Sequence, residues 1–316
     1  WLPGGCSARL CWRCAEPGAT TLEPMEILRT PEDRFADLPD FGWPAQYVEV
    51  HGMRMAYLDE GPRDAEVVLC LHGEPTWGYL YRRMIPVFLA AGLRVVAPDW
   101  LGFGRSDKPA ADTDYTWDFH HSAMRQFVDT LELRDITLVV QDWGGLLGLT
   151  LPVSHPDLIR RLLIMNTGLG VGSKPTPGFL AWRDYVANTP DFNVGELMSR
   201  AETSLTPAEV AAYQAPFPDP SYQAGVRRFP ALVPTSSDAD GVAVSRAAAA
   251  WWATEFAGES FMAIGVDDPV LGPPVMERMR ELIRGCPEPM RVAAGHFVPE
   301  HGEPIARAAL ASWGLA

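Results

Sequence analysis

The sequence has no apolar run long enough to span a membrane, and it is short of positive charge. No stretch of its 316 residues approaches the ~18 consecutive apolar residues of a membrane-spanning helix. It carries 26 Lys and Arg against 40 Asp and Glu, a net charge of −14. Because nucleic-acid binding depends largely on Lys and Arg that contact phosphates, we expect neither a nucleic-acid nor a membrane partner. With 47% hydrophobic and 21% charged residues, the composition is typical of one large globular α/β domain.

Cysteine is sparse, and its placement favours neither zinc nor disulfides. Three of the five cysteines, Cys6, Cys11 and Cys14, lie near the N-terminus with no histidine nearby and no fourth ligand. This disfavours a zinc site. Cys70 lies in an apolar run and Cys286 in a Gly-Cys-Pro loop, and we interpret both as reduced thiols. A reducing compartment follows, so we expect a cytoplasmic protein.

Residues 1–24 differ in character from the rest of the chain. They show no apolar period, contain no initiator Met, and lack the apolar core of about 7–15 residues that a secretory signal needs. Met25 opens the segment MEILRTPEDRF, which reads as a natural beginning. We interpret residues 1–24 as a disordered or non-native extension outside the fold.

Short apolar strands alternate with helical stretches along most of the chain. The run YVEVHGMRMAYLDEG, from Tyr47, predicts a β-hairpin, and residues 115–133 predict a helix. Further strands are expected within 66–73, 94–104, 136–139, 161–168, 260–266 and 290–296. Strands separated by helices in this way predict a mostly parallel central sheet flanked by helices on both faces.

The alternation stops between Leu169 and Asp240. This stretch is rich in proline, has short helical pieces such as TPAEVAAY, and contains no convincing strand. Thr206 and Glu209 form a predicted capping box at the start of one such helix. We therefore predict a helical cap domain at 169–240, inserted into a core domain formed by 25–168 and 241–316.

The most informative segment is VVQDWGG, which places Asp142 on a sharp turn. The strand-like ITLV precedes it, and two glycines and the helix-like LLGLTL follow. Folds with such a nucleophile elbow usually carry serine at this position. A serine that displaced a group from a saturated carbon would form an ether, whereas a carboxylate forms an ester that water can cleave. The elbow therefore predicts substitution at carbon followed by hydrolysis.

Two further residues complete a candidate catalytic triad with Asp142. His296 follows the expected strand MRVAAG, and Asp268 follows SFMAIGV. Taken alone, the first reads equally well as a core histidine and the second as a turn-capping aspartate. Together they give the order nucleophile, acid, histidine, each at the carboxyl end of a strand, which is the arrangement of the α/β-hydrolase fold. Asp267 is a weaker rival for the acid.

The polar groups near the elbow suggest the leaving group. A departing halide needs no proton, only N–H donors in a dry cavity, and an indole donates without accepting. Trp143 follows the nucleophile, and Trp182 lies in the proline-rich stretch, where plain packing is an equally good explanation. The segment HGEPTW would supply one oxyanion-hole donor, the backbone N–H of Glu74, beside that of Trp143.

These segments resemble the haloalkane dehalogenases, in particular the subfamily that holds the halide with two tryptophans. The resemblance runs from about Met25 to the C-terminus and rests on LHGEPTWGYLYR, GFGRSDKP, LVVQDWGG, GFLAW, FMAIGVDDPVLGP and AAGHFVPEHG. It implies Asp142 as nucleophile, His296 as base and Asp268 as its partner. It also implies Trp143 and Trp182 as halide donors, with an oxyanion hole from the backbone of Glu74 and Trp143. The substrate pocket that it implies is lined by Leu146, Phe179, Phe229, Pro230, Val233, Val270 and Leu271.

The resemblance also implies a reaction. A haloalkane would be hydrolysed to a primary alcohol, halide and a proton through an alkyl ester on Asp142, without a cofactor or metal. Water and the halide would be the only other small partners, the protein would act as a monomer, and its role would be detoxification. Family members often carry Phe where this chain has Leu146, which implies a roomier pocket.

Three alternatives stay open. An epoxide hydrolase shares the aspartate elbow and the cap but needs two cap tyrosines, for which Tyr185, Tyr213 and Tyr222 are candidates. A fluoroacetate-type dehalogenase would carry arginines near the elbow, and none follows Asp142 directly. A non-catalytic binding module would lack a triad member, and none is missing. Asn166, where another subfamily places its acid, cannot serve as one.

Overall fold

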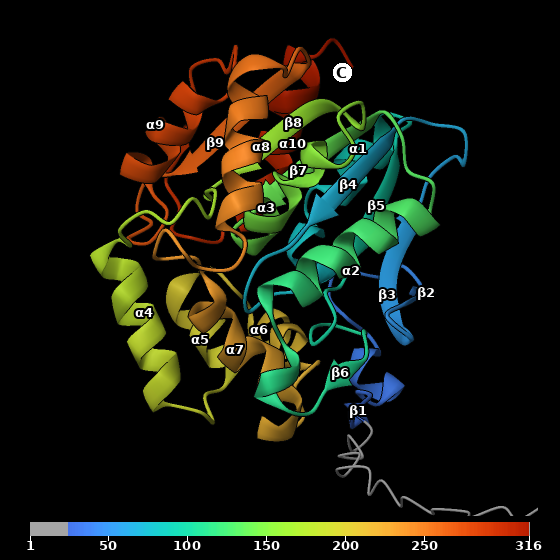
Figure 1. The fold of residues 1–316 in the computed structure, drawn as a ribbon. Helices are drawn as coiled ribbons and strands as arrows, with labels where there is room; N and C mark the ends of the chain where they lie inside the picture. The colour runs from blue at the N-terminus through green and yellow to red at the C-terminus, as the bar shows by residue number, and fades with distance from the viewer. Residues whose placement is uncertain (1–24, 316) are drawn as a thin grey trace, which may run out of the picture.

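A central sheet of eight strands organises the chain in a computed structural model that describes residues 25–315 (Figure 1). The strand order is β10-β9-β8-β7-β4-β5-β3-β2. Only the pairs β2–β3 and β3–β5 are antiparallel, so the predicted mostly parallel sheet is confirmed. The strands are β2 (Gln46–Val50), β3 (Met53–Glu60), β4 (Val67–Leu71), β5 (Arg94–Pro98), β7 (Ile136–Gln141), β8 (Ile159–Met165), β9 (Glu259–Gly265) and β10 (Met290–Val292).

The two strands that lead to Glu74 and Asp142 are buried along their whole length. Every residue of β4 and β7 is buried, because both strands lie in the middle of the sheet with helices on both faces. In Figure 1, α2, α3 and α8 lie in front of the sheet, and α1 and α10 lie behind it. The core helices are α1 (Ile85–Ala90), α2 (Trp117–Thr130), α3 (Trp143–Gly148), α8 (Val242–Thr254), α9 (Pro273–Leu282) and α10 (Gly302–Ser312).

Four α-helices lie between β8 and α8, where the alternation of strands and helices stops. They are α4 (Pro177–Asn188), α5 (Val194–Ala201), α6 (Pro207–Gln214) and α7 (Ala224–Leu232). No residue from 169 to 240 is in a strand, and the capping box of Thr206 and Glu209 forms as predicted. The four helices lie together near the carboxyl ends of the sheet strands (Figure 1).

A second, small sheet was not predicted. It pairs β1 (Ile27–Leu28) with β6 (Lys108–Pro109), two residues each, which is too short to leave a periodic pattern in the sequence. No helix within residues 25–315 is long and apolar enough to cross a membrane. Cys70 and Cys286 are free thiols. The interpretations of residues 1–24 and of Cys6, Cys11 and Cys14 lie outside the described residues.

Candidate active site

The predicted nucleophile, Asp142, lies on the tight turn between β7 and α3. Its backbone has φ 50° and ψ −123°, a positive-φ conformation that costs free energy for any residue with a side chain. Its N–H donates to the Asn166 carbonyl at 3.0 Å, and the Thr167 hydroxyl donates to its carbonyl at 2.6 Å. Gly144 must be a glycine because a Cβ there would overlap the carbonyl of Leu71. The turn therefore holds one carboxylate at the end of a buried strand.

The structure brings the other two predicted triad residues to Asp142. His296, in the loop after β10, places Nε2 3.5 Å from Asp142 Oδ2. Its Nδ1 lies 2.9 Å from Oδ2 of Asp268, which follows β9 and is buried. The geometry requires the Nδ1 proton to face Asp268, which leaves Nε2 pointing toward the nucleophile.

Charge and burial act in opposite directions on the triad. Burial alone would lower the pKa of His296, but the carboxylates of Asp268 and Asp142 outweigh it and raise that pKa well above its ordinary value. Burial would raise the pKa of Asp268, but His296 and hydrogen bonds from Asn166 and the Val270 backbone lower it to about 2. Asp268 is therefore a carboxylate at neutral pH and stabilises a positive charge on the imidazole.

Position on the turn separates Asp268 from its neighbour. Asp267 is exposed and points to the same cavity, whereas the carboxylate that reaches His296 belongs to Asp268. Asn166, at the end of β8, donates from Nδ2 to Asp268 Oδ2 at 2.8 Å and accepts from the Gly265 N–H at 2.8 Å. It thus orients the acid, a contribution that the sequence interpretation missed.

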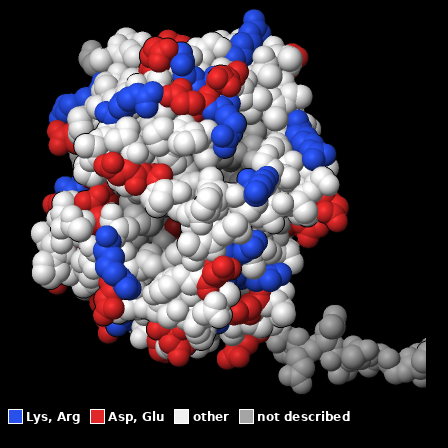
Figure 2. All heavy atoms as spheres, turned by 90° about the vertical axis from the view of Figure 1, so that its left-hand side faces the viewer, with Lys and Arg blue, Asp and Glu red and all other residues white. Residues whose placement is uncertain are grey.

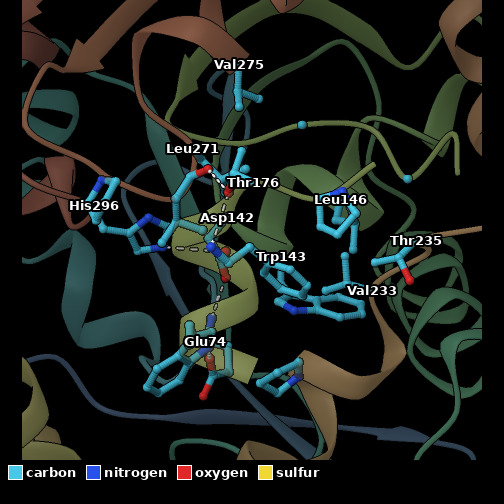
Figure 3. Close-up of a pocket in the computed structure, with 18 of the residues that line it drawn as sticks. Glu74, Asp142, Trp143, Leu146, Thr176, Val233, Thr235, Leu271, Val275 and His296 are labelled. Atoms are coloured by element: carbon cyan, nitrogen blue, oxygen red, sulfur yellow. Dashed lines mark hydrogen bonds and ion pairs between the residues drawn. The ribbon is translucent and has the colours of Figure 1, made fainter. Parts of the chain in front are cut away.

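Glu74 approaches the nucleophile through both its backbone and its side chain. Its N–H donates to Asp142 Oδ1 at 2.8 Å (Figure 3). The Glu74 side chain is buried, and Oε2 accepts from the Trp182 indole at 3.1 Å, while Oε1 has no partner among residues 25–315. Burial, and then the charge of Asp142, raise the pKa of Glu74 well above its ordinary value. Burial and the neighbouring carboxylate therefore both favour the protonated form of the side chain.

Both predicted tryptophans line the same cavity as Asp142. The Trp143 indole stacks on Phe229, with ring centroids 4.2 Å apart, and its N–H has no partner among the described residues. Trp182, on α4, is half-buried and stacks on Tyr185 at 5.8 Å. The Trp182 N–H donates to Glu74, so it is held at the base of the cavity rather than packed in the interior of α4–α7.

A cavity of about 610 Å³ opens above Asp142. Figure 2 shows that the face carrying α4 and α9 is hollowed near its centre, and Figure 3 shows Leu146, Val233 and Leu271 around the nucleophile. Six of the seven predicted pocket residues line this cavity: Leu146, Phe179, Pro230, Val233, Val270 and Leu271. The sequence did not single out Thr176, Thr235 and Val275, which also line it.

The placement of Phe229 differs from its prediction. Its side chain is fully buried and does not line the cavity, because its ring lies behind Trp143, between that indole and His120. The neighbouring Pro230 faces the cavity instead. The helical turn of α7 directs successive residues to different sides, so only some of the apolar residues of this segment reach the substrate space.

The cap tyrosines required by the epoxide alternative are not together. Of the three candidates, only Tyr185 lines the cavity. The Tyr213 hydroxyl is buried against Glu300, and Tyr222 lies outside the cavity lining. The described residues thus offer one tyrosine where that chemistry uses two.

Comparison with known proteins agrees with this architecture. Residues 66–302 match the family model of the α/β hydrolase fold, which confirms the predicted fold. A haloalkane dehalogenase of Psychrobacter cryohalolentis is 45% identical over 294 residues, covering 90% of this chain and 96% of that protein. One from Mycobacterium marinum is 42% identical over 298 residues, covering 92% and 100%.

A solved structure is also similar. The haloalkane dehalogenase DpaA of Paraglaciecola agarilytica, described as tetrameric, superposes with a TM-score of 0.89 at 47% identity. The match covers 91% of this chain and 99% of that one. The match therefore extends over nearly the whole of both chains.

Proposed function

This chain belongs to the haloalkane dehalogenases, hydrolases that act on carbon–halide bonds, and on that premise we propose that it works through a covalent ester on Asp142. The products are a primary alcohol, halide and a proton. One observation carries the proposal: a carboxylate, not a hydroxyl, stands on the elbow at the base of an apolar cavity, with a histidine 3.5 Å away.

In the first step, Asp142 attacks the carbon that bears the halogen. The Glu74 N–H holds Oδ1, which becomes the carbonyl oxygen of the ester, so Oδ2 is the oxygen that forms the new C–O bond. The C–X bond breaks and the halide leaves with its electron pair. The indole N–H groups of Trp143 and Trp182 donate to it, and the Trp182 donor turns from Glu74 toward the halide or is shared with it.

In the second step, water attacks the ester carbonyl carbon. His296 Nε2 takes a proton from the water, and Asp268 stabilises the imidazolium that forms. Negative charge develops on Oδ1, where the backbone N–H groups of Glu74 and Trp143 stabilise it. Collapse breaks the bond from the carboxyl carbon to Oδ2, and the alcohol leaves with that oxygen and takes the second proton of the attacking water. The water oxygen completes the regenerated Asp142 carboxylate, and the first proton passes from His296 to solvent.

The helices α4–α7, within residues 169–240, act as a cap in this scheme. They supply Phe179, Trp182 and Pro230 to the cavity, while the core supplies the triad. The cap excludes bulk water, so that the halide depends on the indoles for its solvation.

The site is complete in a single chain. All of its donors, acids and bases come from one copy, which supports a monomer as the active unit. The Paraglaciecola relative is described as tetrameric, so assembly is a separate question. The test is to dilute the protein while light scattering follows its molecular mass and an assay follows its specific activity. Specific activity that stays constant as copies dissociate would agree with an active monomer, and activity that falls as they dissociate would overturn it.

The sharpest test of the covalent route separates its two steps. His296→Gln removes the base but leaves the nucleophile, so 1,2-dibromoethane should release about one bromide per chain in a burst and then stall. The protein should gain the mass of one bromoethyl group on the peptide that contains Asp142. Asp142→Asn should give neither burst nor adduct, because an amide is a poor nucleophile.

Two outcomes would contradict the proposal. A folded His296→Gln protein that binds bromide but shows neither burst nor adduct would mean that His296 acts before alkylation. Wild-type protein that converts styrene oxide to its diol and releases no bromide from 1,2-dibromoethane would instead be an epoxide hydrolase.

A further inference from the structure

Gln141, the last residue of β7, contacts both the side chain and the main chain of His296. Its side chain is fully buried, one position before the nucleophile. Its Nε2 lies 3.0 Å from the main-chain oxygen of His296 and 3.1 Å from the Nε2 atom of the same residue. One amide group therefore contacts both the backbone and the reactive nitrogen of His296.

The orientation of this amide follows from its neighbours. The His296 carbonyl oxygen can only accept, so the NH₂ group must face it. The reverse orientation would place Oε1 of Gln141 3.0 Å from another acceptor. In the present orientation Oε1 has no partner among residues 25–315. Leaving it unpaired is costly, which indicates that the two contacts of the NH₂ group outweigh that loss.

An N–H group that faces Nε2 requires a lone pair on that nitrogen. It therefore stabilises neutral imidazole with its proton on Nδ1, where Asp268 accepts it. The charged groups that face His296 favour the opposite state: Asp142 on the elbow and Asp268 after β9 both stabilise imidazolium. Glu74, on the loop after β4, is the remaining titratable group nearby, and the Phe297 ring packs edge-on at 5.1 Å. Among residues 25–315, Gln141 is the neighbour whose hydrogen bond to Nε2 favours the free base.

We propose that Gln141 is a positioning residue that favours the neutral form of His296, with the Nε2 lone pair directed away from the Asp268 side of the ring, and so sets the pH range of ester hydrolysis. This inference rests on the proposed two-step reaction. The Gln141 amide has two partners, the His296 carbonyl oxygen and His296 Nε2. When water approaches His296 Nε2, the amide can lose its contact with that nitrogen and still be held by the carbonyl.

The contact from Gln141 should matter most in the second step, the hydrolysis of the ester. Alkylation of Asp142 removes its negative charge, one of the two that favour imidazolium. Gln141 is uncharged and remains in place, so its preference for the free base then opposes Asp268 alone. Formation of the ester therefore shifts the balance at His296 toward the free base, which is the form that deprotonates water.

The test compares two buried glutamines. Gln141→Met removes the donor with little change of volume. Gln223→Met is the control, because Gln223 is also buried, donates from Nε2 to a backbone carbonyl at 3.0 Å and has an Oε1 without a partner among residues 25–315, but that carbonyl belongs to Phe192 and not to His296. Rapid-quench kinetics with 1,2-dibromoethane would give the rate of ester hydrolysis as a function of pH for each protein.

We expect the acid limb of that profile to move up by about half to one pH unit in Gln141→Met, which is the shift that one net hydrogen bond produces. Hydrolysis should slow about three- to tenfold on the acid side, and the burst of halide should be unchanged. Gln141→Glu adds a charge that favours imidazolium and should move the limb further. Gln223→Met should leave it in place.

A second readout does not depend on turnover. The pKa of His296, followed by NMR of the imidazole and assigned by its loss in His296→Gln, should rise in Gln141→Met and not in Gln223→Met. The inference would be overturned if Gln141→Met lowered the maximal rate of ester hydrolysis but left both the acid limb of its pH profile and the pKa of His296 unchanged. Absence of any ester in wild type would instead refute the two-step reaction, while the NMR result would still decide the role of Gln141.

Discussion

At the scale of single residues, the protonation state of Glu74 determines how much negative charge lies at the base of the cavity. A charged carboxylate there would lie beside Asp142 in a buried site, and both burial and that charge raise the pKa of Glu74. The protonated form that this favours can still accept the Trp182 N–H through one oxygen. In that form Glu74 orients one proposed halide donor and adds no negative charge to the proposed halide site.

Replacing Glu74 by Gln should make this protonation visible in stability. The ordinary pKa of Glu is 4.5, and the folded value lies well above it. Between these two values the folded protein binds more protons than the unfolded chain, so wild type loses stability as the pH rises. Glu74→Gln is neutral throughout and should gain more than about 1 kcal/mol relative to wild type between about pH 5 and pH 8. Urea unfolding at both pH values measures this; a difference that does not change with pH would show that Glu74 is ionised.

The sequence pointed to the residues proposed to react more readily than to those that contact them. Asp142 was predicted from the elbow pattern and His296 from its position after a strand, and the structure places the two side chains 3.5 Å apart. Asp268 was favoured over Asp267 by the resemblance, although the two neighbours differ only in which side of a turn they occupy. Gln141 and Asn166 were missed as supports; their one signal was a polar residue at the end of an otherwise apolar strand.

At the scale of elements, a buried ion cluster joins α6 to the loop that carries His296. Arg82 follows the 3-10 turn Gly78–Tyr81 and is fully buried. Its guanidinium donates to Glu300 at 2.6 and 2.7 Å and to Glu209 at 2.7 Å. Glu209 lies on α6, and Glu300 lies four residues beyond the histidine. The cluster therefore holds α6 against the segment that follows His296.

Removing Arg82 should cost far more than removing an exposed arginine. Arg82→Met removes both short contacts to the buried Glu300 and leaves it only the 3.4 Å contact with the partly exposed Arg83. We expect a loss of about 3–5 kcal/mol in the free energy of unfolding. Arg307→Met is the control, because Arg307 and its partner Glu303 are both largely exposed, and it should cost less than about 1 kcal/mol. Denaturant unfolding compares the two. Adding Glu300→Gln to Arg82→Met should recover part of the loss; equal small losses in both arginine variants would mean that the cluster is not coupled to folding.

Elements were predictable where their pattern is local. The sheet strands were found as short apolar runs, and the insertion of α4–α7 was found because strand patterns stop at 169. The packing of those helices was not predictable, because contacts such as that of Arg82 with Glu300 join residues 218 positions apart. The partial failure of the pocket prediction has the same origin: whether Phe229 faces the cavity depends on how α7 is rotated against Trp143.

At the scale of the whole molecule, the net charge of −14 opposes the binding of halide. The cavity lining runs against this trend. Lys174, Arg200 and Arg278 line it and are exposed, and none of them forms an ion pair among the described residues. Asp267 is the one exposed carboxylate in the lining. The exposed part of the lining is therefore locally cationic on an anionic protein, and such a charge would attract the halide that we propose is formed there.

Charge reversal in the exposed part of the lining should weaken halide binding in a salt-dependent way. Unit charges about 10 Å apart in water interact by roughly 0.4 kcal/mol, so a reversal changes the binding free energy by about twice that. Arg200→Glu and Arg278→Glu should each raise the Kd for bromide about two- to fivefold at low ionic strength. The effect should fade near 0.5 M salt, where the screening length is shorter than about 5 Å. Arg307→Glu changes the net charge equally but lies on α10, outside the cavity lining, and should have little effect. Quenching of tryptophan fluorescence by bromide measures all three. A Kd that rises equally in the Arg307 variant would attribute the effect to net charge, and one that does not change at all would leave the cations of the lining without a role in halide binding.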